Sequence, residues 1–185
     1  MTNLLTKTTE LARYLWLPYC DKDKIAVDAT CGNGNDTLFL AANCGFVYGF
    51  DIQETAINNT DNLLKEHGLN NYRLFNLFHS EMSSVLDTKA DLIVFNLGYL
   101  PSGDKAITTE TESTLKALSQ SLDLLNINGL ISIILYCGHE AGKKEKEEVL
   151  EYCRNLDKSR YHCGFISFIN QPNCPPEIVM ITRKR

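Results

Sequence analysis

The sequence predicts an α/β protein with a doubly wound, mostly parallel seven-stranded sheet that ends in an antiparallel C-terminal strand. Short apolar runs alternate with segments whose apolar residues recur at helical spacing, which is the pattern of β-α-β units. Several of these runs are continuously apolar, as in strands that helices cover on both faces. The last two runs follow each other without a helical segment, so we expect them to form an antiparallel pair. No linker or repeat divides the 185 residues, and we expect one domain over 1–185.

The first half of the chain is predicted to contain two helices and three strands after an N-terminal helix. That helix, at 3–16, carries Leu4, Leu11 and Leu15 at near-helical spacing. Gly68 stands where the C-cap of a helix over 55–65 belongs. The remaining expectations rest on short apolar runs: strands at 25–27, 46–50 and 72–76, and a helix at 36–42.

The second half of the chain is predicted to contain two further helices and four strands. Leu115, Leu118 and Leu122 repeat at helical spacing and predict a helix over 109–125. Asn128 and Gly129 are typical turn residues, and we expect them to precede an Ile-rich strand. The expected elements are strands at 91–95, 130–136, 161–169 and 177–182, and a helix at 143–156.

The bulk composition excludes several classes of protein. No apolar run reaches the ~18–20 residues of a membrane span, and the first residues lack the pattern of a secretory signal, so we expect a cytoplasmic protein with no membrane partner. The seven cysteines form no C-x-x-C motif, so we expect reduced cysteines and no metal. A net charge of −5 argues against a basic surface overall, but not against a local basic patch.

The loop after the first predicted strand has the composition of a ligand-binding turn. It reads D-A-T-C-G-N-G-N-D-T at 28–37, and its two glycines permit a tight turn and close approach of a ligand to the backbone. Asp51 ends the second predicted strand, 19 residues after Gly32, where a carboxylate can accept both hydroxyls of a ribose. Together the two loops indicate a site for an adenosine-containing ligand.

The charges of this loop favour S-adenosylmethionine over a nicotinamide dinucleotide. A dinucleotide-binding motif needs a third glycine, and Thr37 stands at that position, which argues against an oxidoreductase. Asp28 and Asp36 would repel a pyrophosphate. S-adenosylmethionine has no phosphate, and its sulfonium and ammonium groups are cationic.

Five stretches of the chain carry a resemblance to a known family. Besides 28–37 they are G-F-D-I-Q at 49–53, N-L-G-Y-L-P-S-G-D at 96–104, G-H-E-A-G-K-K-E-K-E at 138–147 and N-Q-P-N-C-P-P at 170–176. Over nearly the whole chain the sequence resembles the class I methyltransferases described as "putative rRNA methylase". The first loop is similar to their D-x-G-x-G-x-G motif, with Thr30 at the first glycine. The resemblance implies a Rossmann-like fold and, for at least some members, methylation of 5-aminomethyl-2-thiouridine at the tRNA wobble position.

The resemblance also implies which residues hold the cofactor. Asn33 and Asn35 are expected at its methionine end, Asp51 at the ribose and Gln53 against the adenosine. His79 follows the third strand, where such folds contact the adenine edge; without the family it would be interpreted as a surface or capping histidine. The full predicted S-adenosylmethionine site is Asp28, Gly32, Asn33, Gly34, Asn35, Asp36, Asp51, Gln53, His79 and Ser80.

The stretch after the fourth strand is the predicted catalytic loop. Asn96-Leu-Gly-Tyr resembles the N-P-P-Y loop of amino-directed methyltransferases. The resemblance implies that Asn96 and the backbone at Gly98 accept hydrogen bonds from the target nitrogen while Tyr99 stacks on the base. Pro101 is expected to stiffen the loop on the substrate side.

An alkylamine is largely protonated at neutral pH, so the reaction requires a proton acceptor. The candidates are Asp104 and His139, and the alternative for each is a polar turn or loop residue.

Three lysines, Lys143, Lys144 and Lys146, follow the same predicted sheet edge and are expected to contact phosphates of a tRNA anticodon stem-loop. The alternative is a solvated helix face. Because no RNA-binding module is added, either the sheet-edge loops suffice or a homodimer supplies more surface. A methyltransferase for rRNA or for a small molecule is the alternative function, and the pI of about 5.4 favours the small molecule. A binding module without activity is the third hypothesis, against which Asn96, Gly98 and Tyr99 argue.

Overall fold

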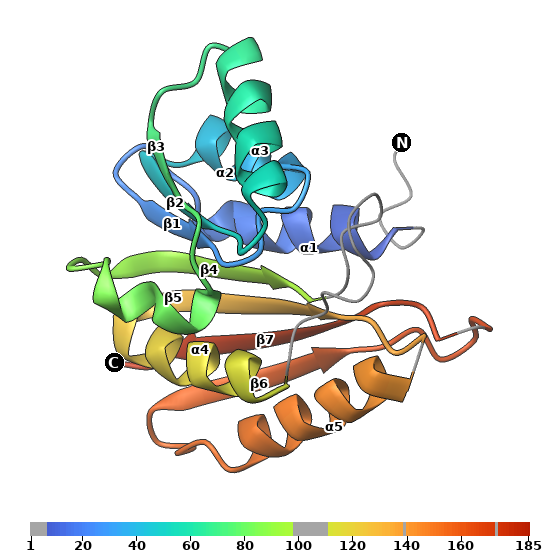
Figure 1. Cartoon of the computed structure of the whole chain (residues 1–185). Helices are drawn as coiled ribbons and strands as arrows, with labels where there is room; N and C mark the ends of the chain where they lie inside the picture. Colours follow the sequence, from blue (N-terminus) through green and yellow to red (C-terminus); the bar gives the residue numbers. More distant parts are fainter. Residues whose placement is uncertain (1–6, 98–110, 139, 173) are drawn as a thin grey trace.

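A seven-stranded sheet with helices on both faces forms the fold (Figure 1). The computed structural model describes residues 7–97, 111–138, 140–172 and 174–185. The strand order is β3-β2-β1-β4-β5-β7-β6, and β7 alone runs antiparallel to its neighbours β5 and β6. This confirms the predicted fold class. The strands are β1 (Ile25–Asp28), β2 (Phe46–Phe50), β3 (Tyr72–Phe75), β4 (Ala90–Asn96), β5 (Leu125–Leu135), β6 (Tyr161–Ile166) and β7 (Glu177–Arg183).

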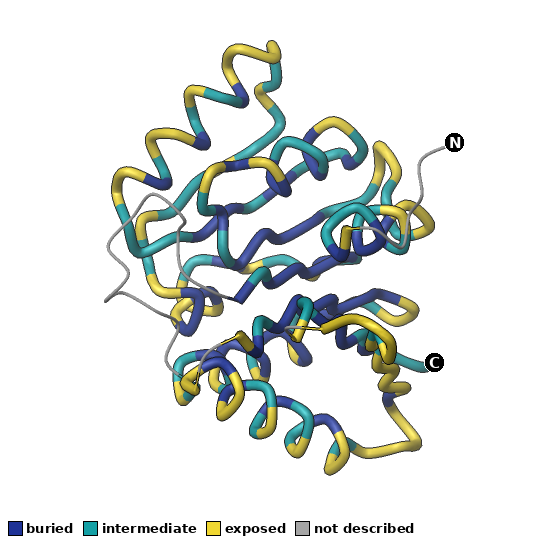
Figure 2. The backbone as a smooth tube through the Cα atoms, turned by 90° about the vertical axis from the view of Figure 1, so that its right-hand side faces the viewer, coloured by how far each residue is buried: buried dark blue, intermediate teal, exposed yellow. Residues whose placement is uncertain are grey.

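Two separate hydrophobic cores hold the helices against the sheet. On one face lie α1 (Thr8–Trp16), α2 (Asn35–Asn43) and α3 (Glu54–Glu66), and the other face is covered by η3 (His79–Ser84), α4 (Thr111–Leu124) and α5 (Glu140–Arg154). The side chains of β4 alternate between the two cores: Val94 packs with the first set of helices and Ile93 with the second. Figure 2 shows the result, since the strands are mostly buried and the helices alternate between buried and exposed turns. A short 3-10 helix, η2 (Leu17–Tyr19), follows α1.

The topology places the predicted site at one edge of the sheet. The chain order reverses between β1 and β4, which lie side by side and are followed by α2 on one face and α4 on the other. Ligands of doubly wound folds bind at this switch point, beyond the carboxyl ends of the strands. Asp28 pairs with Val94, so Asn96 lies two residues further along the neighbouring strand. The ends of β1, β2 and β4 therefore meet at the edge where the cofactor and catalytic loops were predicted.

The observed elements differ from the predicted ones at the bounds of two strands and one helix and in two short 3-10 helices. Strand β5 begins at Leu125 and not at residue 130. Asn128, with a φ of 63°, does not form a turn before the strand; it lies within the strand, where the pairing with β4 is irregular. Strand β6 ends at Ile166 and not at residue 169, since Ile166 pairs with Ile178 close to the start of β7. Helix α5 begins at Glu140 and not at residue 143, and neither η2 nor η3 was predicted.

The turn between α2 and β2 requires glycine. Gly45 donates a hydrogen bond to the Lys24 carbonyl, and a Cβ atom at this position would lie 2.2 Å from the Lys22 carbonyl oxygen. That contact is with backbone, which cannot move aside as the end of a side chain can. Gly164 in β6 has no atom within 4 Å of the same position and provides a matched control.

We therefore predict that Gly45→Ala lowers the free energy of unfolding by roughly 2–3 kcal/mol, because the added methyl group overpacks the turn. Gly164→Ala is expected to change it by no more than about 0.5 kcal/mol. Urea denaturation followed by circular dichroism measures both. Equal stability of the two variants would contradict the close approach at Gly45.

Candidate functional site

Two glycines shape the loop between β1 and α2. Gly32 and Gly34 have φ angles of 53° and 79°, in the left-handed region that side chains rarely adopt. A Cβ atom at Gly34 would also lie 2.9 Å from the Cα atom of Thr60 in α3. The Thr60 hydroxyl donates a 3.4 Å hydrogen bond to the Gly32 carbonyl. The loop is therefore packed directly against α3, with Gly34 buried in this contact and Gly32 partly exposed.

The buried carboxylate of Asp28 connects the two ends of this loop. Its Oδ1 accepts a hydrogen bond from the Thr30 amide at 3.1 Å, and its Oδ2 accepts one from the Thr37 hydroxyl at 2.7 Å. Burial, followed by repulsion from Asp36, raises the pKa of Asp28 to about 7, although both hydrogen bonds oppose the shift. Asp28 is completely buried, so it shapes the loop, whereas direct contact with a cofactor stays a prediction.

Asp51 brings the second predicted loop to the first. Its Oδ2 accepts a 2.9 Å hydrogen bond from the Gly32 amide, and its Oδ1 accepts one of 2.9 Å from the Gln53 amide. The carboxylate is thus fixed by two backbone donors while the residue stays partly exposed. Each oxygen keeps a further lone pair, which fits the predicted bond to a ribose hydroxyl. Gln53 is partly exposed too, and Asn33 and Asn35 are exposed on the first loop.

His79 and Ser80 form the start of η3, directly beyond β3, and both are buried. His79 is 7% exposed, its ring meets Phe95 edge-on with centroids 6.0 Å apart, and its Nε2 lies 3.3 Å from the Ser113 hydroxyl. Burial lowers the pKa of His79 to about 4, so the ring is neutral at physiological pH. The alternative of a surface histidine is therefore wrong. The Ser80 carbonyl accepts a hydrogen bond from Gln120, which ties η3 to α4.

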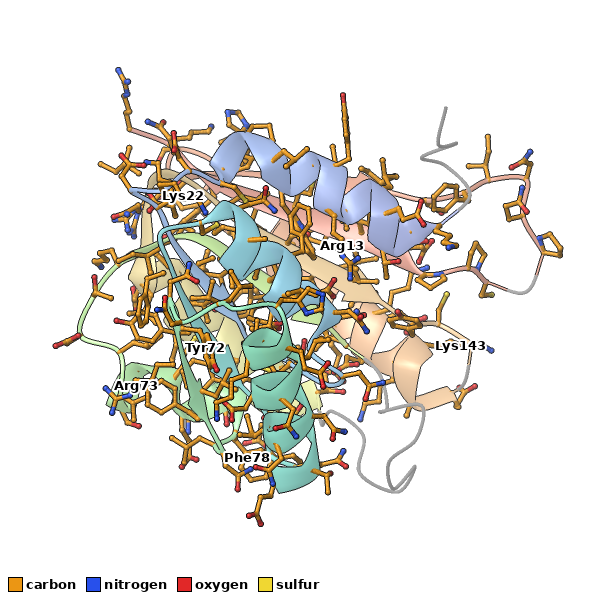
Figure 3. The ribbon with its side chains drawn as sticks, turned by 90° about the horizontal axis from the view of Figure 1, so that it is seen from above. Arg13, Lys22, Tyr72, Arg73, Phe78 and Lys143 are labelled. Carbon is orange, nitrogen blue, oxygen red and sulfur yellow. The ribbon has the colours of Figure 1, made fainter. Side chains whose placement is uncertain are left out.

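The end of β4 is fastened to the first loop. The backbone amide of Asn96 donates to the Thr30 hydroxyl at 2.7 Å, and its side-chain Nδ2 donates to Asp36 Oδ2 at 3.0 Å. Arg13 of α1 binds the other oxygen of Asp36, with Nε and Nη2 at 2.8 and 2.7 Å from Oδ1. Figure 3 shows Arg13 on α1 beside the start of α2. The predicted catalytic Asn96 and the predicted cofactor residue Asp36 thus belong to one network.

Three residues of this network were not predicted. Tyr136 follows β5 at the same edge, and burial together with the nearby Asp36 raises its pKa, while Asn96 opposes the shift. Its place at the end of a predicted strand could have revealed it. Thr30 could have been suspected from its position in the first loop. Nothing in the sequence links Arg13 to this edge, because α1 meets the site only through tertiary packing.

Five predicted residues, Gly98, Tyr99, Pro101, Asp104 and His139, lie outside the described residues. Of the three lysines, Lys143 and Lys144 have exposed side chains with Glu140 and Glu148 at 3.7 Å, contacts that solvent weakens.

Lys146, which was predicted to contact RNA phosphates, has a partner within the protein. It forms an ion pair with the buried Glu177, which raises the pKa of Lys146, and its ammonium lies 5.6 Å from the centre of the Phe165 ring. A phosphate contact would require breaking this pair, so Lys146 connects α5 to the start of β7 instead.

Neither a metal centre nor a membrane span was found in the described part of the chain. No three His, Cys, Asp or Glu side chains there gather closely enough to hold a metal ion. None of the described helices combines the length and the apolar character needed to cross a membrane.

The fold and the site define a Rossmann-like methyltransferase, and comparisons with known proteins specify the family. The model of the family described as "Putative rRNA methylase" matches residues 47–182, and the chain belongs to this family. A relative from Arabidopsis thaliana, "tRNA (mnm(5)s(2)U34)-methyltransferase, chloroplastic", is 38% identical over an alignment of 194 residues. The alignment covers 96% of this chain and 70% of the relative.

Solved structures support the same family. A "putative rRNA-methylase" from Clostridium thermocellum is 40% identical with a TM-score of 0.93, and a "putative methyltransferase" from Streptococcus mutans in complex with SAH is 36% identical with a TM-score of 0.90. Each match covers 96% of this chain and 98% of the other. The recognised resemblance and the seven-stranded fold are thereby confirmed.

The raised pKa of Asp28 predicts how stability depends on pH. The ordinary pKa is 3.8 and the folded-state value is about 7, so the folded protein binds this proton more tightly than the unfolded chain. The stabilising contribution is complete below about pH 4 and is lost as the pH rises through 7, a loss of roughly 2–4 kcal/mol. Asp28→Asn, which cannot titrate, is expected to flatten the decline in the free energy of unfolding between pH 4.5 and 7.5. An unchanged slope in urea denaturation would contradict the buried, protonatable carboxyl.

Proposed function

We propose that this protein is an S-adenosylmethionine-dependent tRNA methyltransferase that methylates the exocyclic amine of 5-aminomethyl-2-thiouridine at the wobble position. The observation that carries the proposal is the fixed position of Asn96, a hydrogen-bonding side chain held against the glycine loop. The name and coverage of the Arabidopsis relative support the substrate, and the Streptococcus mutans structure with SAH supports the cofactor. We extend the proposal to residues 1–185 acting as one domain in the cytoplasm.

The first two loops have the chemistry that S-adenosylmethionine requires. The partly exposed Gly32 leaves the backbone open to close approach, Asp51 offers acceptors to the ribose, and the neutral His79 lies on the side of β3 proposed for the adenine. When bound, the cofactor supplies a methyl group activated by a positively charged sulfur.

The residues at the end of β4 orient the amine that receives this methyl group. Asn96 offers a carbonyl oxygen, which accepts a hydrogen bond from the amine and leaves its lone pair directed at the methyl carbon. We propose that the Gly98 carbonyl accepts a second hydrogen bond and that Tyr99 and Pro101 contact the unstacked base. Asp104 and His139 stay our candidates for removing the proton of the substrate ammonium.

Contacts with the rest of the RNA are proposed for the exposed lysines at the start of α5. Lys143 and Lys144 are exposed and flank the edge that holds Asn96, so they can meet phosphates of the anticodon stem-loop. A homodimer would enlarge this surface, and sedimentation of the protein with a stem-loop would detect it.

A methyltransferase acting on rRNA is the second candidate. The family description and the name of the Clostridium thermocellum protein favour it. One experiment separates the two. Purified protein is incubated with S-adenosylmethionine and either a stem-loop carrying 5-aminomethyl-2-thiouridine or unmodified rRNA, and the nucleosides are analysed by mass spectrometry. The proposal predicts methylation of the stem-loop alone, and methylation of rRNA alone would overturn it.

Asp51→Ala is predicted to abolish tight cofactor binding. Loss of two hydrogen bonds to a carboxylate corresponds to a decrease in affinity of roughly 100-fold. Calorimetric titration with S-adenosylmethionine measures it, and Asp61→Ala, which removes a carboxylate paired with Lys65 on α3, serves as the control. Equal affinities in both variants would refute the ribose contact.

The double variant Lys143→Ala, Lys144→Ala is predicted to bind the stem-loop more weakly and with less dependence on salt. Each lost phosphate contact lowers the slope of log Kd against log salt by about 0.7–0.9. Lys65→Ala, on α3, is expected to leave the slope unchanged. If the double variant keeps the wild-type slope, the RNA does not run across the start of α5.

A further inference from the structure

We propose that Asp36 and Arg13 are positioning residues for Asn96, because they determine which end of its amide faces the methyl acceptor. This inference rests on the proposed function and assigns Asp36 a task other than the expected contact with the cofactor. The observation behind it is the chain of contacts that runs from α1 through the start of α2 to the end of β4.

The contact between Asp36 and Asn96 fixes the orientation of the side-chain amide of Asn96. A carboxylate accepts hydrogen bonds and has no hydrogen to donate, so the nitrogen of the amide must face it. Asn96 Nδ2 lies 3.0 Å from Asp36 Oδ2 in this arrangement. Because the amide group is planar, its oxygen then points away from Asp36. The backbone of Asn96 is held independently by the Thr30 hydroxyl at 2.7 Å, so both the position and the orientation of the side chain are determined.

The orientation of this amide matters for the reaction because its oxygen accepts hydrogen bonds whereas its NH₂ group donates them. The substrate amine is a donor, and only the carbonyl end can accept from it. A flipped amide would direct N–H groups at the amine, and the amine could satisfy them only with the lone pair that must attack the methyl carbon. The two ends have nearly the same shape, so packing alone discriminates weakly between them. A neighbouring carboxylate discriminates strongly.

Arg13 holds the carboxylate that performs this selection. Its Nε and Nη2 both contact Oδ1 of Asp36, which leaves Oδ2 for Asn96. The Asp36 side chain is only 8% exposed, so solvent screens this ion pair little. The guanidinium also offsets the repulsion between Asp36 and the nearby Asp28. Tyr136 is a further titratable group beside the network.

Kinetic measurements distinguish positioning from cofactor binding. For Asp36→Asn, whose own amide can present either end to Asn96, we expect kcat on the stem-loop to fall about 100-fold, the scale expected for a misplaced reacting group. The Kd for S-adenosylmethionine is expected to stay within about threefold of wild type. Arg13→Gln should lower kcat in the same way. Asp61→Asn, the same change at another ion-paired aspartate, should alter neither value.

A double variant tests whether Asp36 acts through Asn96. In the Asn96→Ala background, Asp36→Asn should cause no further loss of kcat, because the group that it orients is gone. Two independent, multiplying losses would overturn the inference, as would a Kd for S-adenosylmethionine that rises in step with the loss of kcat in Asp36→Asn.

A measurement without substrate separates this inference from the proposed function. In wild-type protein the side-chain amide of Asn96, assigned by ¹⁵N NMR through its loss in Asn96→Ala, should give one slowly exchanging pair of N–H signals. Asp36→Asn and Arg13→Gln should shift these signals and speed their exchange with solvent. If the wild type fails to methylate the stem-loop while the signals respond, only the proposed function is refuted. Signals unaffected by either variant would refute the positioning role.

Discussion

The buried carboxylate of Asp28 is the constraint on which the candidate site depends. By accepting hydrogen bonds from Thr30 and Thr37 it closes the loop between β1 and α2 on itself. The loop in turn provides the groups that hold the end of β4, since the Thr30 hydroxyl accepts from the Asn96 backbone and Asp36 accepts from its side chain. A disturbance at Asp28 would therefore reach both the cofactor side and the acceptor side of the proposed reaction.

The second property of the candidate site is its charge. Asp28, Asp36 and Asp51 lie within one pair of loops, and Arg13 compensates for one of them. A cationic ligand relieves the repulsion that remains, whereas a phosphate would increase it. This arrangement also reconciles an acidic protein with an RNA substrate. The negative charge surrounds the site proposed for a sulfonium and an ammonium, while the RNA backbone is proposed to pass the exposed Lys143 and Lys144.

The sequence predicted the parts of this architecture that local signals encode. All seven strands, the five α-helices between and before them, and the glycine loop follow from short patterns. The spacing of Asp51 from Gly32 brought these two residues into one predicted site, and the Gly32 amide does donate a hydrogen bond to Asp51. What it missed are partnerships between distant residues. Nothing local indicates that Lys146 pairs with Glu177, or that η3 buries His79. Asp36 was assigned to the cofactor for its charge, but its contacts with Arg13 and Asn96 arise only when α1 packs beside the sheet.

The most direct test of the central claim is nucleoside mass spectrometry of tRNA from cells that lack this protein. The account predicts that 5-aminomethyl-2-thiouridine accumulates and its methylated form disappears. A wild-type copy should restore the methylated nucleoside, and an Asn96→Ala copy should fail to do so. An unchanged nucleoside profile in the deletion would contradict the proposed substrate, and full restoration by Asn96→Ala would contradict the role of the β4 end.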